Sequence, residues 1–257
     1  MNYNYHAHTW RCGHATGTEE EYIQYAIAHG VKYMGFSDHA PFVFPDGTQS
    51  SYRVQREEAP GYISLLRELR EKYKDQLDMK IGFEMEYYPA YFDAMLQNVR
   101  DLGAEYLILG QHFIYNEHPD GIASSRTSTE EHLKEYVNCV VVAMKSGVFT
   151  YVAHPDLIVF PGELSTYREE MRRLCIASRE YNVPLEINFL GIREGRHYPR
   201  ADFWPVAAEE QAPVTFGFDA HDTRFAYDGA SLAAAEDMVK QYGLNYIGMP
   251  KVISIQK

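Results

Sequence analysis

The stretch Tyr33-Met34-Gly35-Phe36-Ser37-Asp38-His39 combines an apolar run, typical of a buried β-strand, with two residues at its end that can carry chemistry. The same order occurs at the start of the chain, where Asn2-Tyr3-Asn4-Tyr5 precedes His6-Ala7-His8. Side chains at i and i+2 of a strand point to the same face, so His6 and His8 can bind one ligand together. The chain therefore contains a recurring pattern, an apolar strand followed by side chains that can bind a ligand, and we use this pattern to predict the fold.

Apolar strand-like runs of this kind alternate with longer helical patterns along the chain. We expect strands near 2–6, 32–37, 79–86, 105–110, 149–153, 184–188, 214–218 and 245–248. We expect helices from Thr18 to about Gly30, from Ser128 to about Gly147, from Ser165 onward, and near 230–242 before Gly243. This alternation predicts an α/β fold with a parallel sheet, and seven or eight repeats predict closure into a barrel.

One domain over residues 1–257 is expected, because no Pro-, Ser- or Gly-rich linker divides the chain. The longest irregular stretches are roughly 40–57, 113–127 and 189–200, and each follows an expected strand. In an α/β barrel, loops at the carboxyl ends of the strands carry the active site. These three loops are therefore expected to surround it.

The charge and cysteine content exclude several classes of protein. A net charge of -12 argues against a nucleic-acid-binding surface, which needs clustered Lys and Arg. The three cysteines form no C-x-x-C pair, so neither a disulfide framework nor a zinc ribbon is expected. We find no signal-peptide pattern and no run of membrane-spanning length, so we expect a cytoplasmic protein without membrane contact. The oligomeric state is not predicted.

Residues that can bind divalent metals recur where the expected strands end. Imidazole and carboxylate groups are ligands of Zn, Mn and Fe. The nine candidates are His6, His8, His14, His39, Glu84, His112, His154, Asp219 and His221. Cys12, between His8 and His14, is a further possible ligand, with a small buried residue as the alternative.

Six short motifs in order resemble the PHP family (polymerase and histidinol phosphatase). They are H-A-H at 6–8, S-D-H at 37–39, G-F-E at 82–84, G-Q-H at 110–112, A-H-P at 153–155 and D-A-H at 219–221. The chain length, C-G-H at 12–14 and E-I-N at 186–188 resemble the histidinol-phosphatase branch more than the polymerase branch. One departure is Gln111, because relatives often carry Gly-Ser-x-His at this step.

The resemblance implies a distorted (β/α)7 TIM-like barrel with three divalent metal ions (Zn, Mn or Fe) at its carboxyl-terminal mouth. The matching motifs imply a first site of His6, His8, Glu84 and Asp219. They imply a second site of Glu84, His112 and His154, with Glu84 bridging the two. They imply a third site of His14, His39 and His221.

The activity that the resemblance implies is hydrolysis of a small phosphate monoester, as in a histidinol-phosphatase of histidine biosynthesis. A hydroxide that bridges the first two metals would attack phosphorus. One alternative is a PHP phosphoesterase that acts on phosphotyrosine, a nucleotide or a sugar phosphate. Another is a non-catalytic PHP binding module, against which the complete set of ligands argues.

Residues outside the metal set are candidates for catalysis and substrate binding. Asp38 is expected to orient a histidine or to act as an acid, with a strand-end turn residue as the alternative. Arg193 and Arg196 suit bidentate phosphate binding, and His197 in the same loop is a candidate catalytic residue, with a structural histidine as the alternative. Asn188 either supports the site or ends a strand. Candidates for contact with a cationic leaving group are Phe42, Phe113, Tyr115, Asp156, Phe160 and Glu163.

Overall fold

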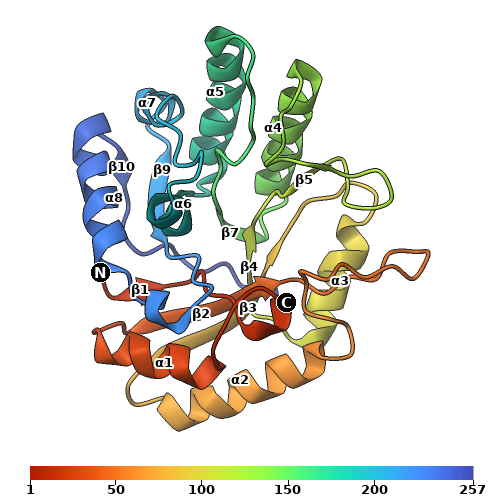
Figure 1. Cartoon of the computed structure of the whole chain (residues 1–257), viewed down its shortest axis with the longest axis vertical. Helices are drawn as coiled ribbons and strands as arrows, with labels where there is room; N and C mark the ends of the chain where they lie inside the picture. Colours follow the sequence, from red (N-terminus) through yellow and green to blue (C-terminus); the bar gives the residue numbers. More distant parts are fainter. Residues whose placement is uncertain (257) are drawn as a thin grey trace.

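A curled parallel sheet forms the centre of the computed structural model, which describes residues 1–256 (Figure 1). The strands are neighbours in the order β1-β2-β3-β4-β7-β8-β9-β10, which is also their order in the sequence. Their bounds are Tyr3–Asn4, Tyr33–His39, Asp78–Met85, Tyr106–Leu109, Phe149–Val152, Leu185–Asn188, Pro213–Gly217 and Asn245–Tyr246. All eight expected strands are present, several of them shorter than predicted.

The sheet closes between the chain segments that follow β1 and β9. Ala7 forms a parallel bridge with Ala220, and the His8 amide donates to the Ala220 carbonyl at 2.9 Å. Strand β10 instead pairs with the start of β9, at Pro213 and Val214. Seven strands thus form the ring and β10 is attached to it, which confirms the distorted (β/α)7 barrel.

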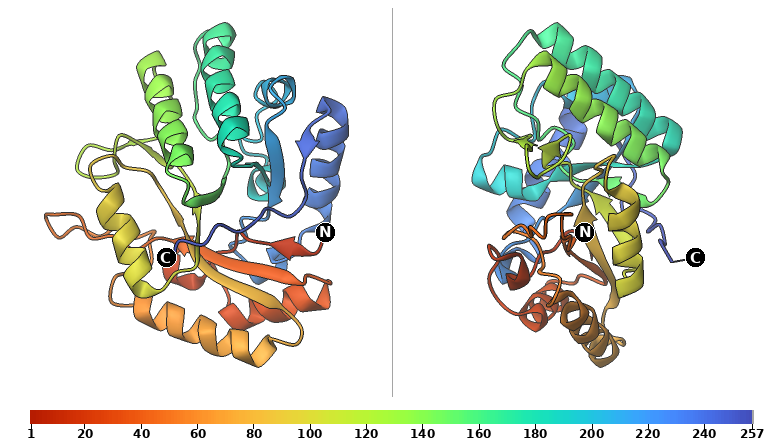
Figure 2. Two further views of the ribbon diagram at one scale, coloured as in Figure 1. Left: turned by 180° about the vertical axis from the view of Figure 1, so that it is seen from behind. Right: turned by 90° about the vertical axis from the view of Figure 1, so that its right-hand side faces the viewer.

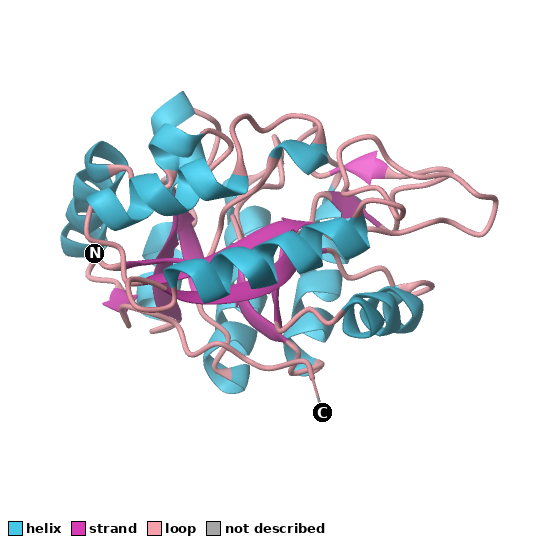
Figure 3. Cartoon of the chain, turned by 90° about the horizontal axis from the view of Figure 1, so that it is seen from below, coloured by secondary structure: helices cyan, strands magenta, loops and turns pink. Residues whose placement is uncertain are grey.

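Helices cover the outer face of the sheet, while the strands lie inside (Figures 2 and 3). They are α1 Glu19–Ala28, α2 Ala59–Tyr73, α3 Phe92–Leu102, α4 Glu130–Lys145, α5 Leu164–Tyr181, α6 Phe189–Glu194, α7 Trp204–Glu209 and α8 Gly229–Tyr242, with 3-10 turns η1 Trp10–Cys12 and η2 Thr223–Phe225. The predicted capping box at the start of α1 is present, because Thr18 and Glu21 exchange hydrogen bonds. Among residues 1–256, no helix is both long enough and apolar enough to span a bilayer.

Two of the loops predicted to be irregular contain regular structure. Within 113–127, β5 (Phe113–Ile114) and β6 (Ile122–Ala123) form an antiparallel hairpin. Within 189–200, α6 begins directly after Asn188, whose side chain caps it by accepting from the Gly191 amide at 3.0 Å. Both elements are too short for hydrophobic periodicity to reveal them.

Successive side chains of a strand point in opposite directions, one into the barrel interior and the next toward the layer under the helices. On β4, Leu107 and Leu109 belong to the large core cluster, whereas Tyr106 and Ile108 belong to a smaller cluster of buried side chains. The Tyr106 hydroxyl donates to the carbonyl of Tyr5 at 3.0 Å within this smaller cluster. The next interior position on this segment is Gly110, where the polar site begins.

Candidate metal centre

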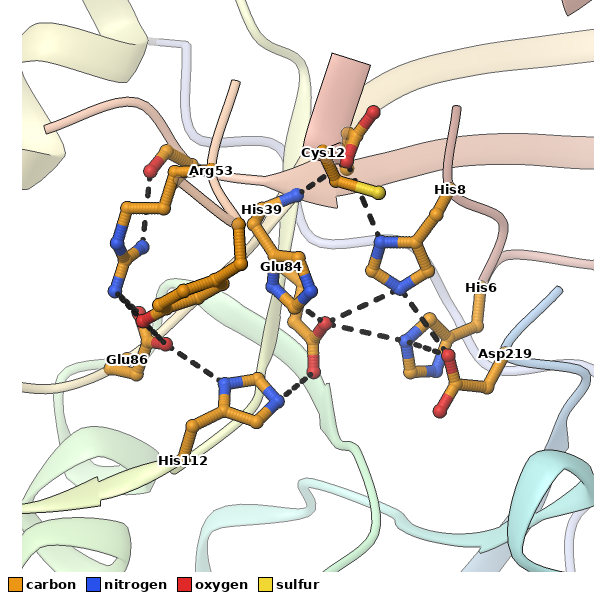
Figure 4. Close-up of polar contacts among 12 residues, drawn as sticks. His6, His8, Cys12, His39, Arg53, Glu84, Glu86, His112 and Asp219 are labelled. Carbon is orange, nitrogen blue, oxygen red and sulfur yellow. Dashed lines mark hydrogen bonds and ion pairs between the residues drawn. The ribbon is translucent and has the colours of Figure 1, made fainter. Parts of the chain in front are cut away.

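Glu84, at the end of β3, lies at the centre of the histidine cluster (Figure 4). Its Oε2 lies 3.4 Å from His8 Nε2 and 3.3 Å from His39 Nδ1. Its Oε1 lies 3.0 Å from His154 Nε2 and 3.4 Å from His112 Nε2. One carboxylate therefore lies within 3.4 Å of four imidazoles that come from four different strand ends.

The nine candidates gather in groups whose ligand atoms lie within 4.8 Å of one another. Three of these groups are His6, His8 and Asp219; Glu84, His112 and His154; and His14, His39 and His221. They match the three predicted sets, with Glu84 beside the first group at 3.6 Å from His6 Nε2. The chain thus assembles three adjoining donor sets around a shared carboxylate.

Several nitrogen and oxygen atoms in this cluster are buried and have no hydrogen-bond partner among residues 1–256. They include His6 Nε2, both ring nitrogens of His8, His39 Nδ1 and Asp219 Oδ1. Buried polar atoms are nearly always paired in proteins, so unpaired ones that face one another need an explanation. The mixture of imidazole nitrogens and carboxylate oxygens is a donor set that fits divalent cations.

Backbone geometry and space at the site are tightly constrained. His154 and Asp219 adopt φ values of 32° and 47°, in the left-handed region that residues other than glycine rarely enter. A Cβ at Gly110 would lie 1.9 Å from Glu84 Oε1, and a Cβ at Gly217 would lie 1.6 Å from Glu186 Oε1. The missing side chains of Gly110 and Gly217 therefore leave room for the carboxylates of Glu84 and Glu186.

Two buried carboxylates that were not predicted as site residues contact the Nδ1 atoms of candidate ligand histidines, on the side of each ring away from Nε2. Glu186 Oε1 lies 2.7 Å from His6 Nδ1, and Glu86 Oε1 lies 2.8 Å from His112 Nδ1. Such partners fix the ring orientation and tautomer of a ligating histidine. The alternation rule used for H-A-H could have found Glu86, because it follows Glu84 at i+2.

Asn188 performs both of the roles considered for it. Besides capping α6, its side-chain amide donates to Asp219 Oδ2 at 3.0 Å and to Glu186 Oε2 at 2.8 Å. Asn188 therefore connects the carboxylate of Glu186, which contacts His6, with the carboxylate of Asp219.

The electrostatics of the site keep its carboxylates ionised. Burial alone would raise the pKa values of Glu84 and Asp219, but the surrounding histidines hold both well below their usual range. Burial opposes protonation of His8, yet the neighbouring carboxylates of Asp219, Asp38 and Glu84 raise its pKa to about 9. Burial lowers the pKa of His39 well below its ordinary value. Anionic carboxylates beside imidazoles are the state in which a cation binds.

A cavity of about 610 Å³ opens over the cluster. Seven of the nine candidates line it, whereas His6 and His8 lie beneath. The rest of the wall includes Tyr52, Phe113, Glu194, Arg196 and Tyr198. A cavity of this size accommodates a small ligand.

Of the two candidate phosphate-binding arginines, the structure brings only Arg196 to the cavity wall. Its Nε donates to Glu194 at 2.8 Å and its Nη1 to the Tyr198 hydroxyl at 2.9 Å. The guanidinium of Arg193 instead binds Asp228 at 3.1 Å and the Asp219 carbonyl at 3.1 Å. Arg193 thus supports the segment that carries Asp219.

The two candidate catalytic residues also lie away from the cavity wall. Asp38 is fully buried, where it accepts from the amides of Thr9 and His39 and lies 3.5 Å from His8 Nδ1. This position favours the histidine-orienting role over that of an acid. The His197 ring contacts the Leu157 carbonyl through Nε2 at 2.6 Å, which favours the structural alternative.

Most of the residues considered for contact with a leaving group also lie elsewhere. Only Phe113 of that set lines the cavity. Asp156 is buried, which raises its pKa to about 6, and it accepts from the Arg200 amide. Cys12 is buried within ligand distance of His8 and His221, and its thiol donates to the Thr9 carbonyl.

Comparison with known proteins identifies the family. A family model described as PHP domain matches residues 4–189. The chain belongs to the PHP domain family. The matched segment contains seven of the nine candidates, and Asp219 and His221 follow it.

Two curated proteins similar to this chain are named as a probable histidinol-phosphatase and a histidinol-phosphatase. The chain is 28% identical to a probable histidinol-phosphatase of Deinococcus radiodurans, covering 84% of this chain and 85% of the relative. It is 27% identical to the histidinol-phosphatase of Bacillus subtilis, covering 87% and 96%. A crystal structure of histidinol phosphate phosphatase from Lactococcus lactis, complexed with zinc, L-histidinol and phosphate, aligns with a TM-score of 0.73. At 21% identity over 99% of this chain and 98% of that one, this match shows a shared fold.

Proposed function

We propose that this PHP protein is a metal-dependent phosphoric monoester hydrolase that converts L-histidinol phosphate and water into L-histidinol and phosphate. The observation that carries the proposal is the Glu84-centred cluster of three donor sets at the floor of a cavity. The names of the curated relatives support the choice of substrate. Three unpaired cysteines suit a reducing cytoplasm, where we place the enzyme in histidine biosynthesis.

The proposed ligands are those of the three predicted sets, for Zn, Mn or Fe ions. Bound there, such ions would supply positive charge for phosphoryl oxygens and an acidified water. Arg196 would bind a phosphate oxygen from the cavity wall, held in place by Glu194. The stacked rings of Phe113 and Tyr52, whose centres lie 6.2 Å apart, would face the imidazole end of the substrate.

The alternative within the family is a phosphatase of other specificity. It is tested by measuring phosphate release from L-histidinol phosphate beside a phosphotyrosine peptide, a nucleoside 3',5'-bisphosphate and a sugar phosphate. We expect L-histidinol phosphate to give the highest kcat/KM. A higher kcat/KM for another ester would support the proposed phosphatase reaction but reject L-histidinol phosphate as the substrate.

A further inference from the structure

Tyr198 occupies a fixed position on the cavity wall between Arg196 and the metal cluster. Its side chain is almost fully buried, and its ring centre lies 5.8 Å from that of His154. Its hydroxyl oxygen accepts from Arg196 Nη1 at 2.9 Å. A Cβ at Gly191 would lie 2.2 Å from the Tyr198 carbonyl oxygen and 2.5 Å from Cδ2 of its ring, so α6 packs directly against the phenol ring. The phenol is therefore held on two sides.

Hydrolysis of an alkyl phosphate leaves an alkoxide, which needs a proton as the phosphorus–oxygen bond breaks. Few groups on this cavity wall can provide one. The histidines of the wall belong to the donor sets, and the Glu194 carboxylate is exposed and paired with Arg196. Ser125 also lines the wall, but its hydroxyl is no stronger an acid than the leaving alcohol. The two phenols of the wall, Tyr52 and Tyr198, remain, because a phenol keeps its proton at neutral pH and is a stronger acid than an alcohol.

The hydrogen bonds of these two tyrosines differ in a decisive way. The Tyr52 hydroxyl donates to Glu117 Oε2 at 2.6 Å, so its proton is engaged. The Tyr198 hydroxyl accepts from Arg196, and within residues 1–256 its own proton has no protein acceptor. Of the two phenols, Tyr198 is therefore the one with an uncommitted proton.

We propose that Tyr198 donates the proton to the leaving alkoxide and that Arg196 stabilises the tyrosinate that remains. The proposal rests on the proposed hydrolase function. Water oxygen bonds to phosphorus, the ester phosphorus–oxygen bond breaks, and the alkoxide takes the Tyr198 proton to leave as an alcohol. The proton released by the attacking water passes to solvent, and solvent returns one to Tyr198, so the atoms balance.

The test compares Tyr198→Phe with wild type, both metal-loaded, on L-histidinol phosphate and on p-nitrophenyl phosphate. Nitrophenolate leaves without a proton, so the second ester reports the remaining machinery. We expect kcat to fall about 10²-fold or more on the alkyl ester, the range of general acid catalysis, and to stay within about threefold on the aryl ester. KM and metal content should change little. Equal losses on both esters, or no loss on the alkyl ester, would overturn the proposal.

Two further variants separate proton donation from structure. Tyr167→Phe removes a buried hydroxyl that lies outside the cavity wall and has no hydrogen-bond partner in the described part of the chain, so both rates should stay unchanged. If Tyr198→Phe does not fold, Arg196→Met keeps the phenol and removes its partner. Arg196→Met should raise KM for both esters but lower kcat mainly for the alkyl ester. An equal loss of kcat on the alkyl and the aryl ester would count against the proposal.

Failure of the proposed function can be told from failure of this inference. If wild type prefers another alkyl phosphate, the substrate is wrong and that ester replaces L-histidinol phosphate in the same comparison. If wild type hydrolyses no ester with any metal, both proposals are overturned.

Discussion

Glu86 joins His112 of the candidate metal centre to the buried Arg53. Its Oε1 lies 2.8 Å from His112 Nδ1, and its Oε2 accepts from Arg53 Nη2 at 2.6 Å (Figure 4). The same guanidinium binds Glu117, from the loop that carries β5 and β6. Arg53 thus connects a metal-ligand candidate with two loops at the mouth of the barrel.

Glu86→Gln should weaken metal binding without abolishing the fold. An amide is a poorer acceptor for the His112 ring N–H, and loss of such partners typically costs about 10- to 100-fold in metal affinity. Competition with a chelator on the purified protein measures the affinity. Glu117→Gln touches the same arginine but not His112, so it should leave the affinity nearly unchanged. Equal affinities for wild type and Glu86→Gln would contradict the assigned role.

Arg53→Met should destabilise the protein by about 3–5 kcal/mol, because it leaves a buried carboxylate without its charge partner. Arg53 is 1% exposed and Glu86 is fully buried, so solvent does not screen the pair. Urea unfolding of metal-loaded protein measures the change. A loss below about 1 kcal/mol, the usual value of a surface pair, would show that the network is solvated.

Gly110→Ala should disrupt the bridging carboxylate, since the added methyl group would lie 1.9 Å from Glu84 Oε1. We expect lower metal content and loss of turnover, measured by elemental analysis and phosphate release. Gly61→Ala is the matched control, because it lies in helix α2 and its Cβ would meet no atom of residues 1–256 within 4 Å. That variant should be active and slightly more stable. Full metal content in Gly110→Ala would argue against Glu84 as a bridge.

The stability of metal-stripped protein should fall as the pH rises from about 7 to 10. The pKa of His8 is raised to about 9, so its stabilising contribution is complete below its ordinary value of 6.5 and is lost through 9. The metal-loaded protein should not lose stability in this range, because metal binding requires deprotonated ligands. Thermal unfolding of both forms at both ends of the range checks this. An equal loss of stability in the metal-stripped and metal-loaded protein would contradict the assignment of His8 as a metal ligand.

Arg193 and Arg196 should respond differently to replacement by methionine. Arg196→Met should raise KM with metal content intact, because its guanidinium lines the cavity. Arg193→Met should lower stability and disturb the Asp219 segment, because Arg193 binds Asp228 and the Asp219 carbonyl. Steady-state kinetics and unfolding of the two variants separate the roles. A selective KM effect of Arg193→Met would restore it as a phosphate contact.

The strands and the clustering of the nine candidates could be predicted because both follow from local rules. A buried parallel strand is an apolar run, and the carboxyl ends of parallel strands meet at one edge. His39 and Glu84 are paired across β2 and β3, as that rule requires. The turn of α6 and the β5–β6 hairpin were missed because they are too short to show periodicity.

The roles of Arg193, Asp38 and His197 depend on tertiary contacts that no local pattern encodes. Arg193 and Arg196 are three residues apart, yet α6 directs one guanidinium toward Asp228 and leaves the other at the cavity. Glu86 and Glu186 act through histidines distant in sequence. Tyr198 stands out only once the hydrogen bonds around Arg196 are known.

The most direct test of the Glu84-centred site is to titrate Mn or Zn into stripped protein while following L-histidinol phosphate hydrolysis and bound metal. The three donor sets predict that turnover appears on metal addition and reaches its plateau at about three ions per chain. Glu84→Gln should bind fewer ions and remain inactive. A plateau at a single ion, or an absence of turnover with every metal, would contradict the account.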